Sequence, residues 1–173
     1  MKSESVAIGL VNPKSPENVG MVLRAAGCYA ADKVFYSGAR YNRARQFFTD
    51  TKNVHEKIPL ECVDNLLAVR PLGAKIVAVE LIEGATPLIH FEHPVHAYYI
   101  FGPEDGSLTQ EILDASDAVV YIPTIGCMNL AATVNVVLYD RLAKRVGSAI
   151  EERPIAQSRD TNSRAKLKNN SHS

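Results

Sequence analysis

The chain has 173 residues, of which 46% are hydrophobic and 22% are charged, and its formal net charge is zero. This is the composition of an ordinary globular domain, and it excludes a chain too polar to bury a core. Residues 1–152 carry 14 Lys and Arg against 18 Asp and Glu, so a uniformly basic nucleic-acid-binding body is excluded, and any such surface would need locally concentrated charge.

Short β-branched or aromatic runs alternate with helix-like segments along the chain. The runs predict strands at residues 6–11, 33–36, 75–81, 97–101 and 119–122. Apolar spacing and helix-opening residues predict helices at 18–29, 60–68, 108–115 and from 129 to about 140. Residues 12–17 and 37–57 are expected to be irregular. This alternation predicts an α/β domain with a mostly parallel sheet flanked by helices.

The predicted helix at 108–115 carries a capping signal. Ser107 precedes it, and Gln110 follows three residues later, which is the spacing of a capping box. The pattern of elements stops after Ile150. Residues 153–173 carry five Lys and Arg against one Asp, which predicts a disordered basic tail after one folded domain at 1–152.

Residues 118–142 are the most informative stretch. A short strand is followed by a loop that contains Pro and Gly, Pro123 to Met128, and the loop leads into an apolar helix. Asn129 stands where an N-cap belongs, next to backbone N–H groups that the helix leaves free. The helix is apolar on most faces, so we expect it to be buried. A buried helix with an exposed N-terminal loop is a suitable place to hold a ligand.

Ligands of α/β sheets bind at the carboxyl ends of the strands. Three predicted strands end in Asn-Pro-Lys-Ser-Pro-Glu-Asn-Val-Gly, Phe-Gly-Pro-Glu-Asp-Gly and Pro-Thr-Ile-Gly. None of these is a Gly-x-Gly-x-x-Gly cradle or a Gly-Lys-Ser/Thr loop. The sequence therefore disfavours a nicotinamide dehydrogenase and a P-loop NTPase.

The cysteines and the N-terminus indicate a compartment. Cys28, Cys62 and Cys127 are odd in number and include no Cys-x-x-Cys pair. This argues against a disulfide framework or a zinc site and suits a reducing cytosol. Neither a signal peptide nor a membrane span is visible in the sequence. We therefore expect a cytoplasmic protein.

Three blocks of sequence resemble the motifs of one family. The first is Asn18-Val19-Gly20, followed by Arg24 and two alanines. The second is the run from Phe101 to Leu108. The third is Ile122-Pro123, followed by Cys-Met-Asn-Leu at 127–130 and the apolar helix. Their order and spacing, which extend over nearly the whole folded part, resemble the SpoU/TrmH branch of the SPOUT RNA methyltransferases.

This resemblance implies a fold and an activity. The fold would be an α/β domain with a deep trefoil knot at its carboxyl end. The activity would be transfer of a methyl group from S-adenosylmethionine (SAM) to a ribose 2′-hydroxyl of RNA by a homodimer. Similarity to small members without an added RNA-binding domain favours tRNA as the substrate, with rRNA as the other possibility.

The resemblance also implies four catalytic residues. Arg24 would bind a phosphate and stabilise alkoxide charge, since a protonated guanidinium is a poor general base. Asn18 would cap the first helix and orient its loop. Glu104 would fix loop backbone or the partner subunit's Arg24. Asn129 would cap the last helix and face the substrate. The alternatives are purely structural roles: a surface ion pair for Arg24 and a simple helix cap for Asn18.

The cofactor slot would be built from residues at or just past strand ends. Apolar residues of this kind alone would indicate core packing, but their position at the starts of three loops favours a binding slot. Gly102 would let the backbone approach the ligand closely. The predicted cofactor-binding residues are Val79, Gly102, Ile122, Cys127, Met128 and Leu130.

The third block departs from the family pattern. Cys127 and Ala131 stand where the family commonly has Ser, and Asn135 stands where a small or apolar residue is usual. The loss of two hydroxyl groups motivates an alternative, a SAM- or RNA-binding homologue with little or no catalytic activity. A third hypothesis, methylation of a base, is disfavoured by Arg24.

The densest basic patch of the body is predicted to bind RNA. Arginines alternate here with aromatic residues, a composition that suits phosphate contacts and base stacking. Its residues are Arg40, Arg43 and Arg45 with Tyr41, Phe47 and Phe48, and Lys14 could add to it. The alternative is a solvated loop. The basic tail could tether RNA or serve only solubility.

A metal site is not expected. His90, His93 and His96 have a spacing that would suit ligands on a helix, but Pro94 and the strand that follows disfavour a helix there. No second cluster of ligands completes the set, and methyl transfer from SAM needs no metal.

Overall fold

In the part of the chain that the structure describes, seven strands form one sheet in the order β3-β2-β1-β6-β4-β7-β5, and all the neighbouring pairs run parallel. The structure is a computed structural model that describes residues 4–46 and 58–145. The strands are β1 Ser5–Val11, β2 Lys33–Ser37, β3 Leu60–Cys62, β4 Lys75–Val79, β5 Thr86–Pro87, β6 His96–Phe101 and β7 Ala118–Tyr121. The helices are α1 Pro16–Cys28, α2 Arg40–Arg45, the short 3-10 helix η2 Leu88–His90, α3 Gln110–Ala115 and α4 Leu130–Arg145.

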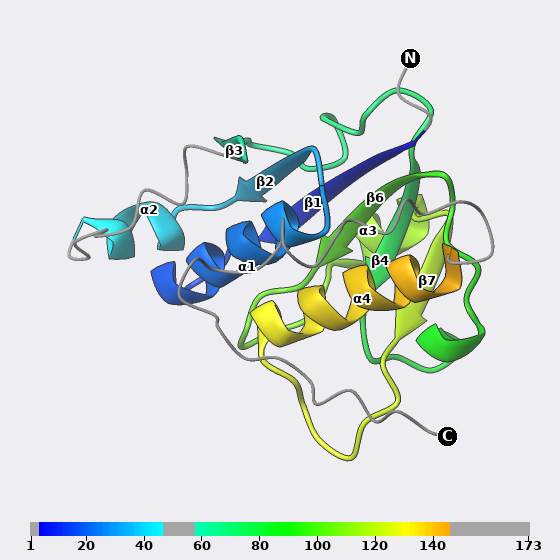
Figure 1. Cartoon of the computed structure of the whole chain (residues 1–173). Coiled ribbons are helices and arrows are strands. Elements are labelled where there is room, and N and C mark those ends of the chain that lie inside the picture. Colours follow the sequence, from blue (N-terminus) through cyan, green and yellow to red (C-terminus); the bar gives the residue numbers. More distant parts are fainter. Residues whose placement is uncertain (1–3, 47–57, 146–173) are drawn as a thin grey trace, which may run out of the picture.

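Helices cover both faces of this sheet, with α1 and α4 side by side on one face and α3 on the other (Figure 1). The strands divide their side chains between the two faces, as the period of two of a β-strand requires. In β1, Ile8 and Leu10 point to the face of α1 and α4, whereas Ala7 belongs to the opposite cluster with Tyr98. The predicted α/β class with a parallel sheet is confirmed.

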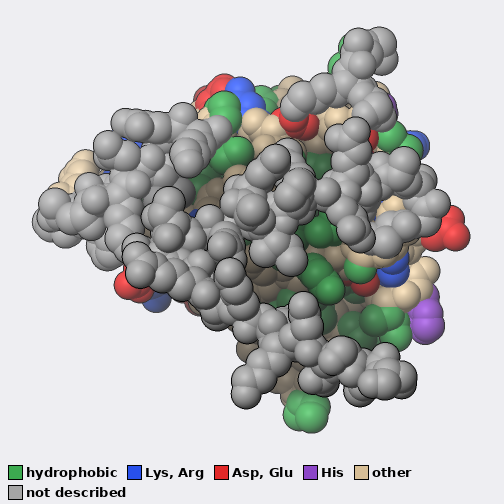
Figure 2. Space-filling view, in the orientation of Figure 1, with side chains coloured by type: hydrophobic (Ala, Val, Ile, Leu, Met, Phe, Trp, Pro, Cys, Tyr) green, Lys and Arg blue, Asp and Glu red, His purple; other side chains and the backbone are tan. Residues whose placement is uncertain are grey.

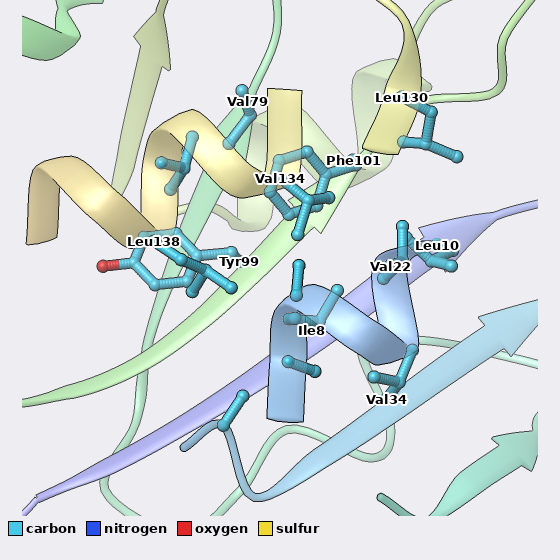
Figure 3. Packing of buried hydrophobic residues seen from close by; sticks show 14 of the residues in the cluster. Ile8, Leu10, Val22, Val34, Val79, Tyr99, Phe101, Leu130, Val134 and Leu138 are labelled. Atoms are coloured by element: carbon cyan, nitrogen blue, oxygen red, sulfur yellow. The ribbon is translucent and has the colours of Figure 1, made fainter. Parts of the chain in front are cut away.

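The core under α1 and α4 is continuous. Val22 from α1 and Val134 and Leu138 from α4 pack over Ile8 and Tyr99 of the central strands (Figure 3). All five side chains are at most 2% exposed. This packing holds the two helices in place on the sheet. It therefore determines where their N-termini lie relative to the ends of the strands.

Helix α1 begins two residues earlier than predicted. Its N-cap is Ser15, whose Oγ accepts a 3.2 Å hydrogen bond from the backbone N–H of Asn18, and Pro16 occupies the first turn. Proline is favourable there because the N–H that it lacks would have no partner within the helix. The prediction that Asn18 caps this helix was therefore wrong.

Three other segments also differ from the prediction. Residues 60–68 were expected to form a helix, but β3 occupies 60–62, because Leu60 pairs with Val34 of β2, a long-range contact that local apolar spacing does not reveal. The segment after β2 contains the short helix α2. Helix α3 begins only at Gln110, and its N-cap Thr109 makes no side-chain capping bond, so the predicted capping box is absent.

Helix α4 is longer than predicted, with 16 residues, and is less buried. One side packs on the sheet, while Val136, Tyr139 and Leu142 are 36%, 61% and 37% exposed. Hydrophobic side chains are visible on this face of the molecule (Figure 2). The predicted burial on most faces was wrong, and an apolar stripe remains open.

Tyr98 is an unusual member of the opposite cluster. Its ring lies over Gly9, where a Cβ atom would come within 2.8 Å of the hydroxyl oxygen. The hydroxyl is buried and has no hydrogen-bond partner among the described residues. Burial raises the pKa of Tyr98 well above the ordinary value for tyrosine.

Some predictions fall outside the described residues. These are Phe47 and Phe48 of the basic patch and the tail at 153–173. Among the helices within 4–46 and 58–145, none combines the length and hydropathy needed to cross a bilayer.

Candidate functional site

A cavity lies where three strands end and the last helix begins. Its walls come from the segments that follow β4, β6 and β7 and from the first turn of α4. These strands are parallel neighbours in the sheet, so their carboxyl ends meet at one edge. Such an edge is where α/β sheets bind ligands.

All six residues predicted to bind the cofactor line this cavity. They come from strand ends that are far apart in the sequence, namely 79, 102 and 122, and from the loop before α4. Cys127, one of the six, is exposed and is not part of the core. Binding of a cofactor by these residues stays a prediction.

A chain of hydrogen bonds joins three of the four predicted catalytic residues. The side-chain nitrogen of Asn18 donates to Oε1 of Glu104 over 3.1 Å. The side-chain nitrogen of Asn129 donates to Oδ1 of Asn18 over 2.8 Å. These contacts fix the amide orientations, since each nitrogen faces an acceptor. The three sequence blocks therefore meet at one point beside the cavity.

Asn129 also caps α4, as predicted. Its Oδ1 accepts hydrogen bonds from the backbone N–H groups of Ala131 and Ala132, at 2.9 and 3.3 Å. The amide oxygen thus holds the helix, while the amide nitrogen binds Asn18. One side chain therefore couples the start of α4 to α1.

Glu104 anchors the first loop. Its carboxylate accepts from the backbone N–H groups of Lys14 and Ser15, at 2.9 and 3.1 Å, in addition to the bond from Asn18. Burial opposes ionisation of this carboxyl, but the hydrogen bonds from Asn18 and from the loop backbone outweigh it, and the pKa of Glu104 is lowered. The group is therefore a carboxylate at neutral pH and acts as an acceptor only.

Arg24 stands apart from this arrangement. It is exposed on α1 and is not among the residues that line the cavity. No hydrogen bond or ion pair joins it to another residue within 4–46 or 58–145. The bland alternative of a surface ion pair is therefore not seen in the part of the chain that the structure describes. A single chain does not bring Arg24 to the cavity.

The basic patch is partly neutralised. Arg40 forms a bidentate ion pair with Asp105, at 2.7 and 3.0 Å, and the Lys14 ammonium lies 3.8 Å from the same carboxylate. The hydrogen bond from Arg40 lowers the pKa of Asp105. Arg40 and Lys14 therefore do lie together, but their charge is shared with the loop after β6.

The other members of the patch differ in exposure. Arg43 and Arg45 are exposed, and the Arg45 guanidinium lies over the Tyr41 ring at 5.9 Å. Tyr41 is only 3% exposed and packs edge-on against Tyr36. It belongs to the core, so its predicted role in base stacking is wrong.

The histidines have separate structural roles. His93 is held between the Tyr99 hydroxyl at 2.6 Å and the Asp140 carboxylate at 2.8 Å, and His96 contacts Ser5. Burial lowers the pKa of His93. Within the described ranges, no group of three potential metal ligands lies together.

Two charged residues in or beside the site were not predicted from the sequence. Glu80 lines the cavity directly after β4, and Asp105 holds Arg40. Glu80 carried a signal, because a charged residue that immediately follows a buried strand stands at the carboxyl edge of the sheet. Asp105 carried none, since its partner is 65 positions away.

One family model matches this chain, whereas a comparison with curated proteins finds none that match. The model of the SpoU rRNA Methylase family matches residues 5–139. A search of the curated proteins returns no significant match.

Several solved structures share the fold. The TrmH/SpoU tRNA modifying enzyme of A. aeolicus is 21% identical over 83% of this chain and 77% of its own, with a TM-score of 0.70. The SpoU methyltransferase AviRb of Streptomyces viridochromogenes, in complex with AdoMet, is 17% identical over 86% and 63%, with a TM-score of 0.69. A protein from work on the 2-OH methylation of C/U34 on tRNA is 23% identical over 84% and 99%, with a TM-score of 0.68. The chain spans less than two thirds of the length of AviRb.

Proposed function

The chain belongs to the SpoU rRNA methylase family of RNA methyltransferases, and on that premise we propose that it transfers a methyl group from SAM to a ribose 2′-hydroxyl of RNA. The complex of AviRb with AdoMet supports SAM as the donor. We favour tRNA over rRNA because two of the similar structures concern tRNA, and one of them is covered to 99% by this chain.

The observation that carries the proposal is the hydrogen-bond chain from Glu104 through Asn18 to Asn129. It joins the three family-like blocks beside the cavity, which Glu104 lines, with distances of 3.1 and 2.8 Å. A purely structural role would not require three polar side chains from distant segments to converge beside an open cavity. Polar groups that converge on a largely apolar cavity are typical of ligand sites.

The lining of the cavity fits SAM. Ile122, Met128 and Leu130 supply apolar surface for a flat purine. Gly102 leaves the space between the strand ends open, because a Cβ atom there would lie 3.4 Å from Glu80 Oε2 and 3.5 Å from the Leu108 nitrogen. We expect backbone groups of the loop before α4, which also lines the cavity, to contact the base.

The residues of the chain then have separate tasks in the reaction. When bound, SAM would supply a methyl carbon on a sulfonium. The ribose oxygen would form the new C–O bond as the S–C bond breaks, the S–C electron pair would stay on sulfur, and the hydroxyl proton would pass to water. Arg24 binds the adjacent phosphate, positions the ribose and stabilises negative charge on the oxygen. Glu104, Asn18 and Asn129 hold the loops that shape the site.

A homodimer completes this proposal. Arg24 does not reach the cavity of its own chain, so the partner subunit's Arg24 would complete the site. The open apolar side of α4, with Val136, Tyr139 and Leu142, supports a second copy as its cover. We also propose that the protein is cytoplasmic, that its domain ends near residue 152, and that the fold has a trefoil knot at its carboxyl end.

For the RNA, we propose contacts with phosphates from the basic patch. Arg43 and Arg45 are exposed on α2. Arg40 and Lys14 share the Asp105 carboxylate, so they would exchange that partner for a phosphate when RNA binds. Loss of the contacts with Asp105 would cost little free energy, because exposed ion pairs contribute little to stability.

One alternative is kept. Ala131 is 1% exposed in the core and cannot supply a hydroxyl to the site. A homologue that binds SAM or RNA without efficient catalysis would fit this departure. It would bind SAM but would leave RNA unmodified.

The test is transfer of labelled methyl groups from SAM to tRNA and rRNA that lack the modification. The proposal predicts label in nuclease-resistant 2′-O-methylated dinucleotides. For Arg24→Ala, the rate of methyl transfer should fall by about 100-fold or more. Arg70→Ala, an exposed arginine of the loop before β4, is the matched control and should behave as wild type. Label in a base would contradict the ribose assignment, and SAM binding without any transfer would favour the alternative.

A further inference from the structure

Glu80 is an acidic residue in the wall of the cavity, outside the hydrogen-bond chain of Glu104, Asn18 and Asn129. It follows β4 directly, and its backbone N–H donates to the carbonyl of Val120 in β7 over 2.9 Å. The residue is therefore fixed in the sheet at the point where two neighbouring strands end. Its side chain lines the cavity and is partly buried.

The orientation of the carboxylate is defined by two backbone donors. Oε2 accepts from the N–H of Leu108 over 2.7 Å, and Oε1 accepts from the N–H of Leu81 over 3.0 Å. Each oxygen has two lone pairs, so each keeps one acceptor position unused by these contacts. The carboxylate therefore offers two adjacent acceptors, one on each oxygen, beside the bare backbone of Gly102.

We infer that the Glu80 carboxylate binds the two ribose hydroxyls of the methyl donor, an inference that rests on the proposed function. A vicinal diol has two adjacent O–H donors, which match two adjacent free acceptor positions. Hydrogen bonds to an ionised acceptor are the stronger class. In another group of α/β nucleotide-binding domains, an acidic side chain near a strand end likewise binds a ribose hydroxyl.

The position of Glu80 favours the ribose over the sulfonium of the donor. Its contacts are Leu81, Leu108 and Gly102, all on the side of β4 and of the loop after β6. The hydrogen-bond chain proposed to shape the transfer site includes Asn18 and Asn129, on the side of α1 and α4. Among the described residues, no hydrogen bond joins Glu80 to Asn18 or Asn129, and we therefore assign Glu80 to a part of the donor away from the transferred methyl group.

Calorimetry with S-adenosylhomocysteine and its 2′-deoxy and 3′-deoxy analogues tests this inference. For wild type, removal of either hydroxyl should weaken binding about tenfold or more. For Glu80→Gln, S-adenosylhomocysteine itself should bind about tenfold more weakly, and removal of a hydroxyl should then change the affinity by less than about threefold. Glu83→Gln, in the same loop but outside the cavity lining, is the matched control and should reproduce the wild-type values.

A purely structural role of Glu80 would weaken all three ligands equally and leave the penalty for each missing hydroxyl unchanged, which would overturn the inference. If Glu80 faces the sulfonium, Glu80→Gln will weaken SAM far more than S-adenosylhomocysteine, and the inference also fails. Wild type alone decides the matter if the variant does not fold, because unchanged affinity for the deoxy analogues contradicts the assignment. Absence of any binding to wild type would overturn the proposed function as well, so the two failures are distinguishable.

Discussion

Asn18 and Asn129 are 111 positions apart in the sequence, yet the side-chain nitrogen of Asn129 lies 2.8 Å from the side-chain oxygen of Asn18. The same Asn129 side chain caps α4 through its oxygen. The start of the last helix is thereby tied to the first helix, next to the cavity. The first prediction separates these two tasks of one side chain.

Asn129→Ala removes both the cap and the link to Asn18, whereas Asn129→Ser keeps a capping oxygen and removes the link. We expect the free energy of unfolding to fall by about 1 kcal/mol for the alanine variant and to change little for the serine variant. Methyl transfer should fall for both. Urea unfolding and a transfer assay measure the two effects. Full activity of Asn129→Ser would show that the link is not needed.

Glu104 gives a pH dependence with a defined sign. Its folded-state pKa is lowered, so the carboxylate stabilises the fold above its unfolded pKa, and this stabilisation is lost as the pH falls through the folded-state value. Glu104→Gln should therefore be less stable than wild type at neutral pH, and the difference should shrink below about pH 4. Urea midpoints over this range provide the measurement. A gap that stays constant down to acid pH would contradict the assigned hydrogen bonds.

Removal of the Tyr98 hydroxyl should stabilise the fold. The group is buried without a partner among the described residues, and such a group is costly to desolvate. Tyr98→Phe is therefore expected to raise the free energy of unfolding by about 1 kcal/mol. Tyr99→Phe is the matched control, because the Tyr99 hydroxyl contacts both His93 and Arg141 and its loss should destabilise the fold. Destabilisation by Tyr98→Phe would reveal a partner for the hydroxyl.

Complementation between subunits tests whether Arg24 acts across a dimer. Arg24→Ala and Asn129→Ala should each be inactive, but dimers formed from an equal mixture of the two should regain about a quarter of wild-type activity. Half of the dimers would be mixed, and each would hold one site with an intact cavity and an intact partner arginine. Co-expression with two affinity tags isolates the mixed dimer. If Arg24 acts within its own chain, the mixed dimer stays inactive.

Much of the fold was predictable because its signals are local. Strand β1 and the capped start of α4 were both recognised, since β-branched runs and an N-cap asparagine are read from neighbouring residues. The strand at Leu60 was missed because its pairing with Val34 is long-range. Proline at the start of α1 was interpreted as part of a loop, although Pro16 occupies the first helical turn.

The candidate site was predictable where a family-like block marked it. Gly102 and Leu130 line the cavity, as expected from those blocks. The blocks did not reveal that Asp105 neutralises Arg40 or that Asn18 binds Glu104 in place of capping a helix, because both facts depend on contacts between distant segments. Arg24, the predicted catalytic arginine, is not among the residues that line the cavity of its own chain.

The central claim is that the cavity at the ends of β4, β6 and β7 holds the methyl donor. A crystal structure of the chain with S-adenosylhomocysteine tests it most directly. The account predicts the base against Ile122, Met128 and Leu130 and the ribose beside Glu80. A well-occupied ligand elsewhere on the molecule, with this cavity empty, would contradict the claim.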